Sequence, residues 1–481
     1  MSMTASSAKV QNWMRRIDHV HFVGIGGVGM GGIAEVMVNL GYSVSGSDMA
    51  RNALVERLES LGARVFIGHD ESNVEGVDVV VVSSAISKDN PEVVVARQNR
   101  VPVIRRAEML GELMRFKQGI AIAGTHGKTT TTSLVASLLT EGGLDPTYVI
   151  GGKLTSSSTN AYLGQSEWLV AEADESDASF LSLQPVIAIV TNIDADHLSS
   201  YENDFDRLKN AFIEFLQHLP FYGLAVMCID DETVRSLVDR IARPVMTYGF
   251  SDDADVQGVN FRQDKMKSCF DVKLPDGTEM RQITLNLPGR HNASNALAAV
   301  AVGWELGLRG QNIRRAFQHF EGIGRRAQAL RALQLADGQA ELFDDYGHHP
   351  REVSATLEAI KAGRPNNRLV VVFQPHRYTR TRDLFDDFIE ALGDADVLVL
   401  CEVYPAGEAP ITGADGRALA RAIRQRGVID PIFINDIDQV GKTLESLLVP
   451  NDVVLTLGAG SIGSVAAGLP DYFATLEASD V

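Results

Sequence analysis

Short apolar runs alternate with helix-length segments along most of the chain. Residues 18–110 contain five β-rich runs separated by helical patterns, which predicts an α/β domain of the mononucleotide-binding type. The five predicted strands are residues 19–25, 42–48, 63–68, 78–85 and 101–106.

The same alternation predicts a second α/β unit. It begins with the apolar run 119–123, and further strands are predicted at 168–174, 186–193 and 224–230. Residues 250–287 instead have the pattern of antiparallel strands joined by a Pro-Asp-Gly turn. A helix is predicted to follow, from His291 to about Leu306.

A third α/β unit is predicted after a linker at residues 321–328. Its strands are predicted at 341–347, 369–375, 396–405, 431–436 and 452–460. The predicted fold class is therefore α/β with three domains, the first and third Rossmann-like and the central one of the P-loop type. The predicted boundaries are residues 1–114, 115–325 and 326–481.

A glycine-rich turn follows the first predicted strand. Gly24, Gly26 and Gly29 form G-x-G-x-x-G, and Asp48 follows about twenty residues later, as in NAD-binding βαβ units. This favours an NAD-dependent oxidoreductase as one hypothesis. The same pattern recurs in LGAGSIG, residues 457–463, so it reports a tight strand-to-helix turn rather than nicotinamide.

Composition limits the class of partner. The chain has 481 residues and a formal charge of −18, which argues against nucleic acid as the main partner. Its three cysteines are far apart and form no C-x-x-C pair, as expected of a reduced, cytoplasmic protein. The N-terminus lacks an apolar signal region, and no apolar run approaches a membrane span of ~20 residues, so no membrane association is expected.

The strongest motif is AGTHGKTTT, residues 123–131, which lies between a predicted strand and a predicted helix. Glycines let backbone N–H groups converge on phosphate oxygens, and the helix N-terminus favours negative charge. Lys128 can reach the β- and γ-phosphates, and the Thr129 hydroxyl can bind Mg²⁺. The full P-loop pattern is not met, because Ile122 occupies the position of its first glycine.

Acidic residues follow the next two apolar strands, where ligands of open parallel sheets bind. Glu172 is the first choice for a magnesium ligand. His197 is either a softer ligand or a hydrogen-bonded structural histidine. Asp194 and Asp196 are interpreted as caps of the following turn.

ATP is favoured over GTP, because TNID lacks the lysine of the guanine-reading N-K-x-D motif. Asn292 and Asn295 are spaced i, i+3 on the predicted helix, so two amides on one face could contact adenine or a neighbouring loop. The alternative is that Asn292 caps the helix N-terminus.

Two clusters of charged and histidine side chains follow strands of the third domain. Residues 343–353 contain Tyr346 and His348, and residues 373–384 contain Arg377 and Arg380. Clustered guanidinium groups bind carboxylates or phosphates, and histidines transfer protons near neutral pH. The alternative is two solvated loops.

Taken together, these motifs resemble the Mur ligase family, the ATP-dependent amino-acid ligases of bacterial cell-wall synthesis. The resemblance rests on GTHGKTTT, EADESD, TNIDADHL, LPGRHNASNALAA, GRR, DDYGHHP and PHRYTR, in family order from about residue 18 onward. It implies three α/β domains, which bind a UDP-sugar, ATP with Mg²⁺, and an amino acid. A carbamylated lysine, present in some members, is not located here.

The resemblance also implies roles for individual residues. Those implied for ATP are Gly124, Thr125, His126, Gly127, Lys128, Thr129, Thr130, Asn292, Asn295 and Arg326. Those implied for metal are Thr129, Glu172 and His197. Those implied for the UDP-sugar are Gly26, Gly27, Val28, Gly29, Asp48, Ser83 and Ser84. Those implied for the amino acid and the sugar's lactyl carboxylate are Tyr346, His348, Arg377 and Arg380. Lys128, His348 and Arg377 are the expected catalytic residues.

The implied reaction joins L-alanine to the lactyl carboxylate of UDP-N-acetylmuramate, through an acyl phosphate and a tetrahedral intermediate, with ADP and phosphate as products. The sequence leaves open whether glycine or serine replaces alanine, how many metal ions bind, and whether the protein is a monomer or a homodimer. The competing hypotheses are the oxidoreductase and a non-catalytic ATP-binding regulator.

Overall fold

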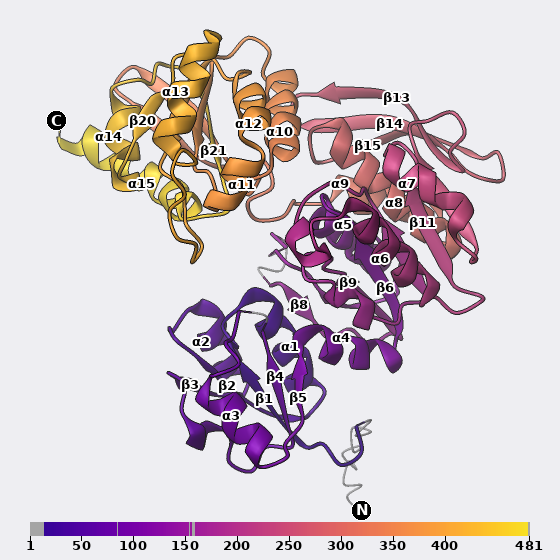
Figure 1. The fold of residues 1–481 in the computed structure, drawn as a ribbon. Helices are drawn as coiled ribbons and strands as arrows, with labels where there is room; N and C mark the ends of the chain where they lie inside the picture. Colours follow the sequence, from indigo (N-terminus) through magenta and orange to yellow (C-terminus); the bar gives the residue numbers. More distant parts are fainter. Residues whose placement is uncertain (1–13, 84, 153, 156–158, 480–481) are drawn as a thin grey trace, which may run out of the picture. The chain divides into compact units, whose positions relative to one another are not determined.

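The computed structural model describes residues 14–83, 85–152, 154–155 and 159–479 (Figure 1). They form two compact units. The first runs to Val259 and adds Val272–Met280 and Ser294–His319, and the second holds Asn260–Asp271, Arg281–Ala293 and Phe320 onward. Among the described residues, no helix is both long and apolar enough to cross a membrane.

The first sheet of unit 1 is parallel and has the strand order β3-β2-β1-β4-β5. Its strands are β1 (His19–Val23), β2 (Ser43–Asp48), β3 (Arg64–Ile67), β4 (Val79–Val82) and β5 (Val103–Arg105). Its helices are α1 (Val28–Asn39), α2 (Ala53–Ser60), α3 (Pro91–Gln98) and α4 (Arg106–Arg115), with the 3₁₀ turn η1 (Glu71–Val74). The strand order reverses between β1 and β4, and ligands of open α/β sheets bind at such a switch point.

The second sheet has ten strands in the order β15-β14-β13-β12-β11-β10-β6-β9-β7-β8. They are β6 (Gln118–Ala123), β7 (Thr147–Val149), β8 (Ala161–Tyr162), β9 (Trp168–Glu172), β10 (Ile187–Val190), β11 (Leu224–Cys228), β12 (Val245–Gly249), β13 (Val256–Asp264), β14 (Lys267–Lys273) and β15 (Glu279–Leu285). The associated helices are α5 (Lys128–Glu141), α6 (Phe205–Gln217), α7 (Glu232–Leu237), α8 (Arg290–Glu305) and α9 (Gly310–Gln318), with η2 (Ser179–Ser182), η3 (Leu198–Tyr201) and η4 (Val238–Arg240).

Unit 2 contains a six-stranded sheet in the order β16-β17-β21-β18-β19-β20, parallel except for the antiparallel pair β16–β17. Its strands are β16 (Gln328–Leu335), β17 (Gly338–Asp345), β18 (Leu369–Phe373), β19 (Val397–Cys401), β20 (Ile432–Ile434) and β21 (Val453–Leu457). Its helices are α10 (Pro350–Gly363), α11 (Tyr378–Asp383), α12 (Phe385–Leu392), α13 (Gly416–Arg426), α14 (Val440–Glu445) and α15 (Ile462–Ser479), with η5 (Ile437–Gln439).

All strands predicted in the α/β parts are present, and the predicted turn joins β14 to β15 through a Gly277 N–H bond to the Leu274 carbonyl. Two details of the prediction were wrong. The linker predicted at 321–328 ends one residue early, because Gln328 begins β16. The strands β7, β8, β12 and β16 were not predicted at all.

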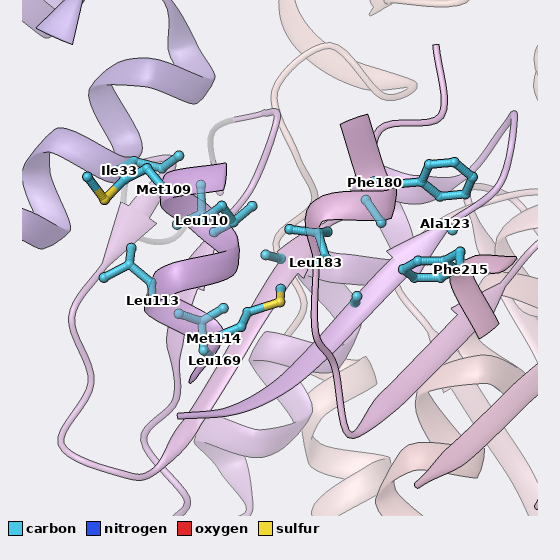
Figure 2. Packing of buried hydrophobic residues seen from close by; sticks show 14 of the residues in the cluster. Ile33, Met109, Leu110, Leu113, Met114, Ala123, Leu169, Phe180, Leu183 and Phe215 are labelled. Atoms are coloured by element: carbon cyan, nitrogen blue, oxygen red, sulfur yellow. The ribbon is translucent and has the colours of Figure 1, made fainter. Parts of the chain in front are cut away.

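A large apolar cluster in unit 1 contains residues from both of its sheets (Figure 2), and a smaller, separate one contains Val23, Val74, Val77, Val80 and Ala96. Helix α4 supplies four side chains of the large cluster, and each of them is less than a tenth exposed. They are Met109, Leu110, Leu113 and Met114. Ile33 from α1 and Phe215 from α6 belong to the same cluster. Burying side chains of this size stabilises the fold by about 1.5–3 kcal/mol each, so α4 fixes the two sheets of unit 1 to a shared core.

Candidate active site

The N-terminal glycine turn is held by the neighbouring strand β2. The Ser47 carbonyl accepts the N–H groups of Gly24 and Ile25 at 2.8 and 3.0 Å. The Asp48 carboxylate accepts the Gly26 N–H at 2.8 Å. Asp48 therefore shapes the turn that lies at the carboxyl end of β1.

A pocket of about 540 Å³ in unit 1 opens beside this switch point. Its lining includes Ser83, Lys88, Arg105, Arg106, Asp177 and Ser200. Ser83 thus lies where a ligand of the sheet is expected. Ser84, the other serine predicted here, lies outside the described residues.

Arg106 was not predicted as a site residue, yet it connects the glycine turn with the central sheet. A Cβ on Gly29 would collide with the Arg106 guanidinium, so a side chain at this position would have to displace it. The same guanidinium lies 3.4 Å from a carboxylate oxygen of Asp174. The position of Arg106 directly after β5, like that of Ser83 after β4, is the signal that could have identified it.

The phosphate loop connects β6 to α5, as predicted. Gly127 has φ 83°, and a Cβ there would lie 2.6 Å from Oδ1 of Asn295. The His126 N–H donates to Oδ1 of Asn192 at 2.8 Å, and the Thr191 hydroxyl donates to the His126 carbonyl at 2.6 Å. The structure therefore brings Asn295 against the loop, and it fixes the loop to the end of β10. Thr130, in the first turn of α5, is buried.

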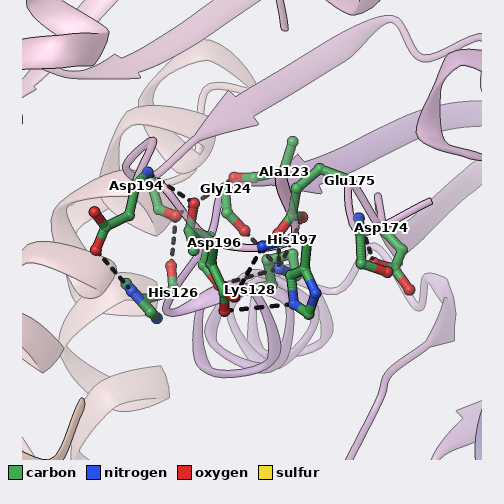
Figure 3. Close-up of polar contacts among 12 residues, drawn as sticks. Ala123, Gly124, His126, Lys128, Asp174, Glu175, Asp194, Asp196 and His197 are labelled. Carbon is green, nitrogen blue, oxygen red and sulfur yellow. Dashed lines mark hydrogen bonds and ion pairs between the residues drawn. The ribbon is translucent and has the colours of Figure 1, made fainter. Parts of the chain in front are cut away.

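Lys128 lies inside a group of carboxylates (Figure 3). Its Nζ is 2.9 and 2.8 Å from the two oxygens of Glu175, and it also donates to the Gly124 carbonyl at 2.6 Å. Burial alone lowers the pKa of Lys128, but the charges of Glu175, Asp174 and Glu172 outweigh burial and raise that pKa above its usual value. The ammonium is therefore charged at neutral pH.

The predicted metal ligands come from adjacent strand ends. Glu172 is the last residue of β9 and pairs in register with Ile122 of β6, two residues before the phosphate loop. One oxygen of Glu172 accepts the Gly151 N–H at 2.6 Å. The Glu172 carboxylate and the Thr129 hydroxyl are hard oxygen donors, which Mg²⁺ prefers. Because the surrounding carboxylates also favour a cation, the residues present fit Mg²⁺.

His197 lies at the start of η3, with φ 54°. Its backbone N–H donates to Asp196 at 2.8 Å, and its Nε2 lies 3.5 Å from the same carboxylate. Asp194 likewise accepts the Ala195 N–H at 2.9 Å. The two aspartates thus hold the turn, as predicted, and the His197 imidazole is oriented by Asp196.

The alternative role considered for Asn292 was wrong. Helix α8 begins at Arg290, so Asn292 lies inside its first turn rather than at the N-cap. Its side-chain amide donates to the Pro288 carbonyl at 2.8 Å.

In unit 2, four rings form a chain at the ends of β17, β18 and β19. Tyr346, His348 and His376 follow one another with centroids 5.4 and 5.7 Å apart, and Tyr404 stacks on His376 at 5.5 Å. Burial lowers the pKa of His348, against the opposing effect of Glu352. Burial also lowers the pKa of His376, to about 4. Both imidazoles are therefore neutral at pH 7.

The predicted arginines lie beside these rings. Arg380 is buried, with Nη1 3.5 Å from Nδ1 of His376. Arg377 donates to Glu408 at 3.3 Å. Tyr404 and Glu408 were not predicted, although Tyr404 closes a predicted strand segment and has the same strand-end position that identified the other residues.

Arg325 and Arg326 both lie beside the Tyr346 ring, but their other contacts differ. The Arg326 guanidinium lies 5.5 Å from the centre of the Tyr346 ring, which places it beside the ring chain. The Arg325 guanidinium also lies beside this ring, 5.2 Å from its centre, but it donates to Asp344 at 2.7 Å and to the Gly458 carbonyl at 2.5 Å. Arg325 is therefore a structural tie within unit 2.

The second glycine turn is closed by side chains of this protein. A Cβ on Gly460 would lie 2.5 Å from Oε1 of Gln374, and the Ile462 N–H donates to that oxygen at 3.0 Å. Arg325 crowds Gly463 in the same way. This turn serves packing, so it gives no support to a second dinucleotide site.

A phosphate loop, acidic strand ends and a cluster of arginines and neutral histidines define a nucleotide-dependent α/β enzyme. Three family models match the chain: the Mur ligase family catalytic domain at 19–118, the Mur ligase middle domain at 122–303, and the Mur ligase glutamate ligase domain at 325–460. The chain belongs to the Mur ligase family, and the predicted three-domain α/β fold is confirmed.

Individual relatives agree with this assignment. A UDP-N-acetylmuramate–L-alanine ligase of Methylococcus capsulatus is 59% identical over 95% of this chain and 97% of the relative. A crystal structure of UDP-N-acetylmuramate–alanine ligase from Thermotoga maritima has a TM-score of 0.80 at 29% identity, covering 95% of this chain and 99% of that one. A MurF ligase from Thermotoga maritima, solved with ADP, has a TM-score of 0.61 at 16% identity, covering 90% and 96%, and is similar in fold. These findings give no support to an oxidoreductase.

Proposed function

We propose that this enzyme uses ATP to join L-alanine to the lactyl carboxylate of UDP-N-acetylmuramate, giving ADP and phosphate, in peptidoglycan precursor synthesis. The observation that carries the proposal is that Lys128, at the start of α5, and Glu172, the last residue of β9, lie at the two sides of the phosphate loop that follows the adjacent strand β6. The 59% identical relative bears the name of this activity. ATP as co-substrate favours a cytoplasmic location.

The first step transfers the γ-phosphoryl group of ATP to the lactyl carboxylate, because a free carboxylate is a poor electrophile. Several negative charges meet in this step. Lys128, charged at neutral pH, and Arg326 neutralise them. Thr129 and Glu172, with His197 beside them, would hold Mg²⁺, which would supply further charge neutralisation on the phosphates.

The second step is attack of the alanine amine on the acyl phosphate, and phosphate leaves the tetrahedral intermediate. The amine must lose a proton. His348 is neutral because burial lowers its pKa, so its imidazole can accept that proton. Arg377 and Arg380 bind the amino acid's carboxylate. Tyr346 lies against His348 and completes this site.

The UDP-sugar is assigned to the switch point of the first sheet. Gly26, Gly27, Val28 and Gly29 open α1, whose N-terminus favours the pyrophosphate, and Asp48 and Ser83 flank the turn. Arg105 and Arg106 give the adjoining pocket positive charge in an otherwise acidic protein. The domain boundaries proposed are residues 1–114, 115–325 and 326–481.

A phosphate-release assay tests the proposal. Release must require ATP, UDP-N-acetylmuramate and an amino acid together, and a panel of alanine, glycine and serine defines the third substrate. A missing methyl changes specificity by only ~1–3 kcal/mol, so relative rates are needed rather than yes-or-no results. Equal release without the UDP-sugar would contradict the proposal.

A further inference from the structure

Arg377 has an unusual backbone conformation that several groups hold in place. Its φ is 72° and its ψ is 134°, a region that costs a non-glycine residue free energy. The Arg377 N–H donates to the Tyr404 carbonyl at 2.9 Å. The Arg377 carbonyl accepts from the N–H and the hydroxyl of Thr381, at 3.1 and 2.9 Å. Strained residues of this kind persist where the surrounding structure over-determines them, and they cluster at functional sites.

The side chain of Arg377 is held separately, by Glu408. One oxygen of Glu408 accepts from Nη1 of Arg377 at 3.3 Å and from the Thr379 hydroxyl at 2.7 Å. The other oxygen accepts the Thr379 N–H at 3.0 Å. Both Glu408 oxygens are thus engaged with the segment that carries Arg377.

The loop after β19 is built to deliver this carboxylate. Tyr404 donates its N–H to the Pro375 carbonyl at 2.8 Å, which joins the loop to the segment before Arg377. The chain then turns through Ala406 and Gly407, with φ 48° and 85°, and the Glu408 N–H closes the turn on the Pro405 carbonyl at 2.9 Å. Two residues with positive φ are therefore used to present Glu408 to Arg377.

We propose that Glu408 is a positioning residue, which holds the Arg377 guanidinium in the orientation that receives the carboxylate of the incoming amino acid. This inference rests on the proposed function. It adds the Tyr404–Glu408 segment to the amino-acid site.

Exposure and charge agree with this role. The Arg377 side chain is 47% exposed, whereas that of Glu408 is 19% exposed. A guanidinium has five N–H donors, so one bound to Glu408 leaves others for a planar, bidentate carboxylate. Burial raises the pKa of Glu408, but the hydrogen bonds from Thr379 and Arg377 outweigh burial and lower that pKa below its usual value. Glu408 is therefore ionised at neutral pH.

The test compares Glu408→Gln and Glu408→Ala with Glu445→Gln in steady-state phosphate release. Glu445 is a matched control, because it accepts a hydrogen bond from Tyr472 at 3.0 Å on α14 of the same unit. We expect both Glu408 variants to raise KM for alanine about tenfold, since a charge-assisted hydrogen bond is lost. KM for ATP and for the UDP-sugar should stay within about twofold, and the control should match the wild type. A purely structural loss would instead lower kcat and disturb all three KM values.

A double-mutant cycle with Arg377→Ala separates the possible failures. In the Arg377→Ala background, Glu408→Gln should have no further effect on KM for alanine, because Glu408 acts through Arg377. Independent, multiplicative effects would overturn the inference. So would an unchanged KM in the single Glu408 variants while Arg377→Ala raises it. If Arg377→Ala leaves KM unchanged, both the arginine assignment and the inference fall. If the wild type releases no phosphate with UDP-N-acetylmuramate and alanine, the proposed function itself fails.

Discussion

Nζ of Lys128 lies 2.8 Å from Oε2 of Glu175, and the side chain of that glutamate is only 3% exposed. The ion pair therefore lies beside the phosphate loop in a region that is largely shielded from solvent. The Tyr201 hydroxyl donates to the Glu175 carbonyl at 2.5 Å, which fixes the backbone that carries the carboxylate. A buried, fixed counter-charge keeps Lys128 ionised and limits its positions to the mouth of the loop.

Lys128→Ala should lower kcat/KM for ATP by about 10²–10³, the loss typical of one preorganised charge that acts on a transferring group. The variant should also unfold at a lower temperature, because the Glu175 carboxylate is left buried without its charged partner. Steady-state phosphate release measures the first effect and thermal unfolding the second. Lys209→Ala is the control, because Lys209 is a lysine of the same unit that pairs with the exposed Asp206 on α6. Full activity of Lys128→Ala would show that the nucleotide assignment is wrong.

Gly127→Ala should raise KM for ATP and reduce kcat, because its Cβ would lie 2.6 Å from Oδ1 of Asn295. Gly143→Ala is a matched control: Gly143 has φ 79°, close to the 83° of Gly127, but a Cβ there meets no atom within 4 Å. Both variants carry the backbone cost of a positive φ, about 1 kcal/mol. Only Gly127→Ala displaces Asn295. Equal kinetics of the two variants would contradict a role for Asn295 at the loop.

Sequence patterns identified the features whose signal is local. The phosphate loop is visible because a strand, two glycines, a lysine and a helix are consecutive in the chain. Glu172 is visible because it ends an apolar run. In both cases the parallel ladder of β6 and β9 then brings the strand ends together.

The features that sequence reasoning missed depend on pairs that are distant in the chain. The role of Arg106 depends on its contacts with Gly29 and Asp174, and Asp174 is 68 residues away in the sequence. The role proposed for Glu408 likewise depends on its contact with Arg377, which lies 31 residues earlier in the sequence. The strand β16 was missed because its antiparallel register shifts between Leu330 and Leu333, which interrupts the period-two pattern.

The acid limb of the pH–rate profile should depend on His348. Burial lowers the pKa of His348, so the neutral imidazole persists below the usual value of 6.5, and kcat/KM for alanine should fall only at more acid pH. His348→Gln should lower kcat by about 10², a typical effect of losing a general base. It should also flatten the acid limb. A profile that keeps the same limb in His348→Gln would assign the proton transfer to another group.

Glu92, in helix α3 beside the first sheet, should make the free energy of unfolding depend on pH. Its carboxylate is fully buried and accepts hydrogen bonds from Ser47 and Asn73, both at 2.6 Å, and His69 lies at 3.0 Å. Burial raises the pKa of Glu92, but the interactions with His21 and the hydrogen bonds outweigh burial and lower that pKa below 4.5. The unfolded chain therefore binds the proton more tightly than the folded one. The resulting stabilisation is complete above pH 4.5 and is lost as the pH falls through the folded pKa.

Glu92→Gln tests this linkage by urea unfolding at several pH values. At pH 7 the variant should be less stable by about 1–3 kcal/mol, because buried donors lose a charged acceptor. Below pH 4.5 the difference from the wild type should shrink, since the wild-type carboxyl is then protonated as well. Glu75→Gln, at an exposed position of the same domain, should change stability little at either pH. A stability difference for Glu92→Gln that stays constant from pH 7 to pH 3 would mean that packing, rather than the ionised carboxylate, stabilises this part of the sheet.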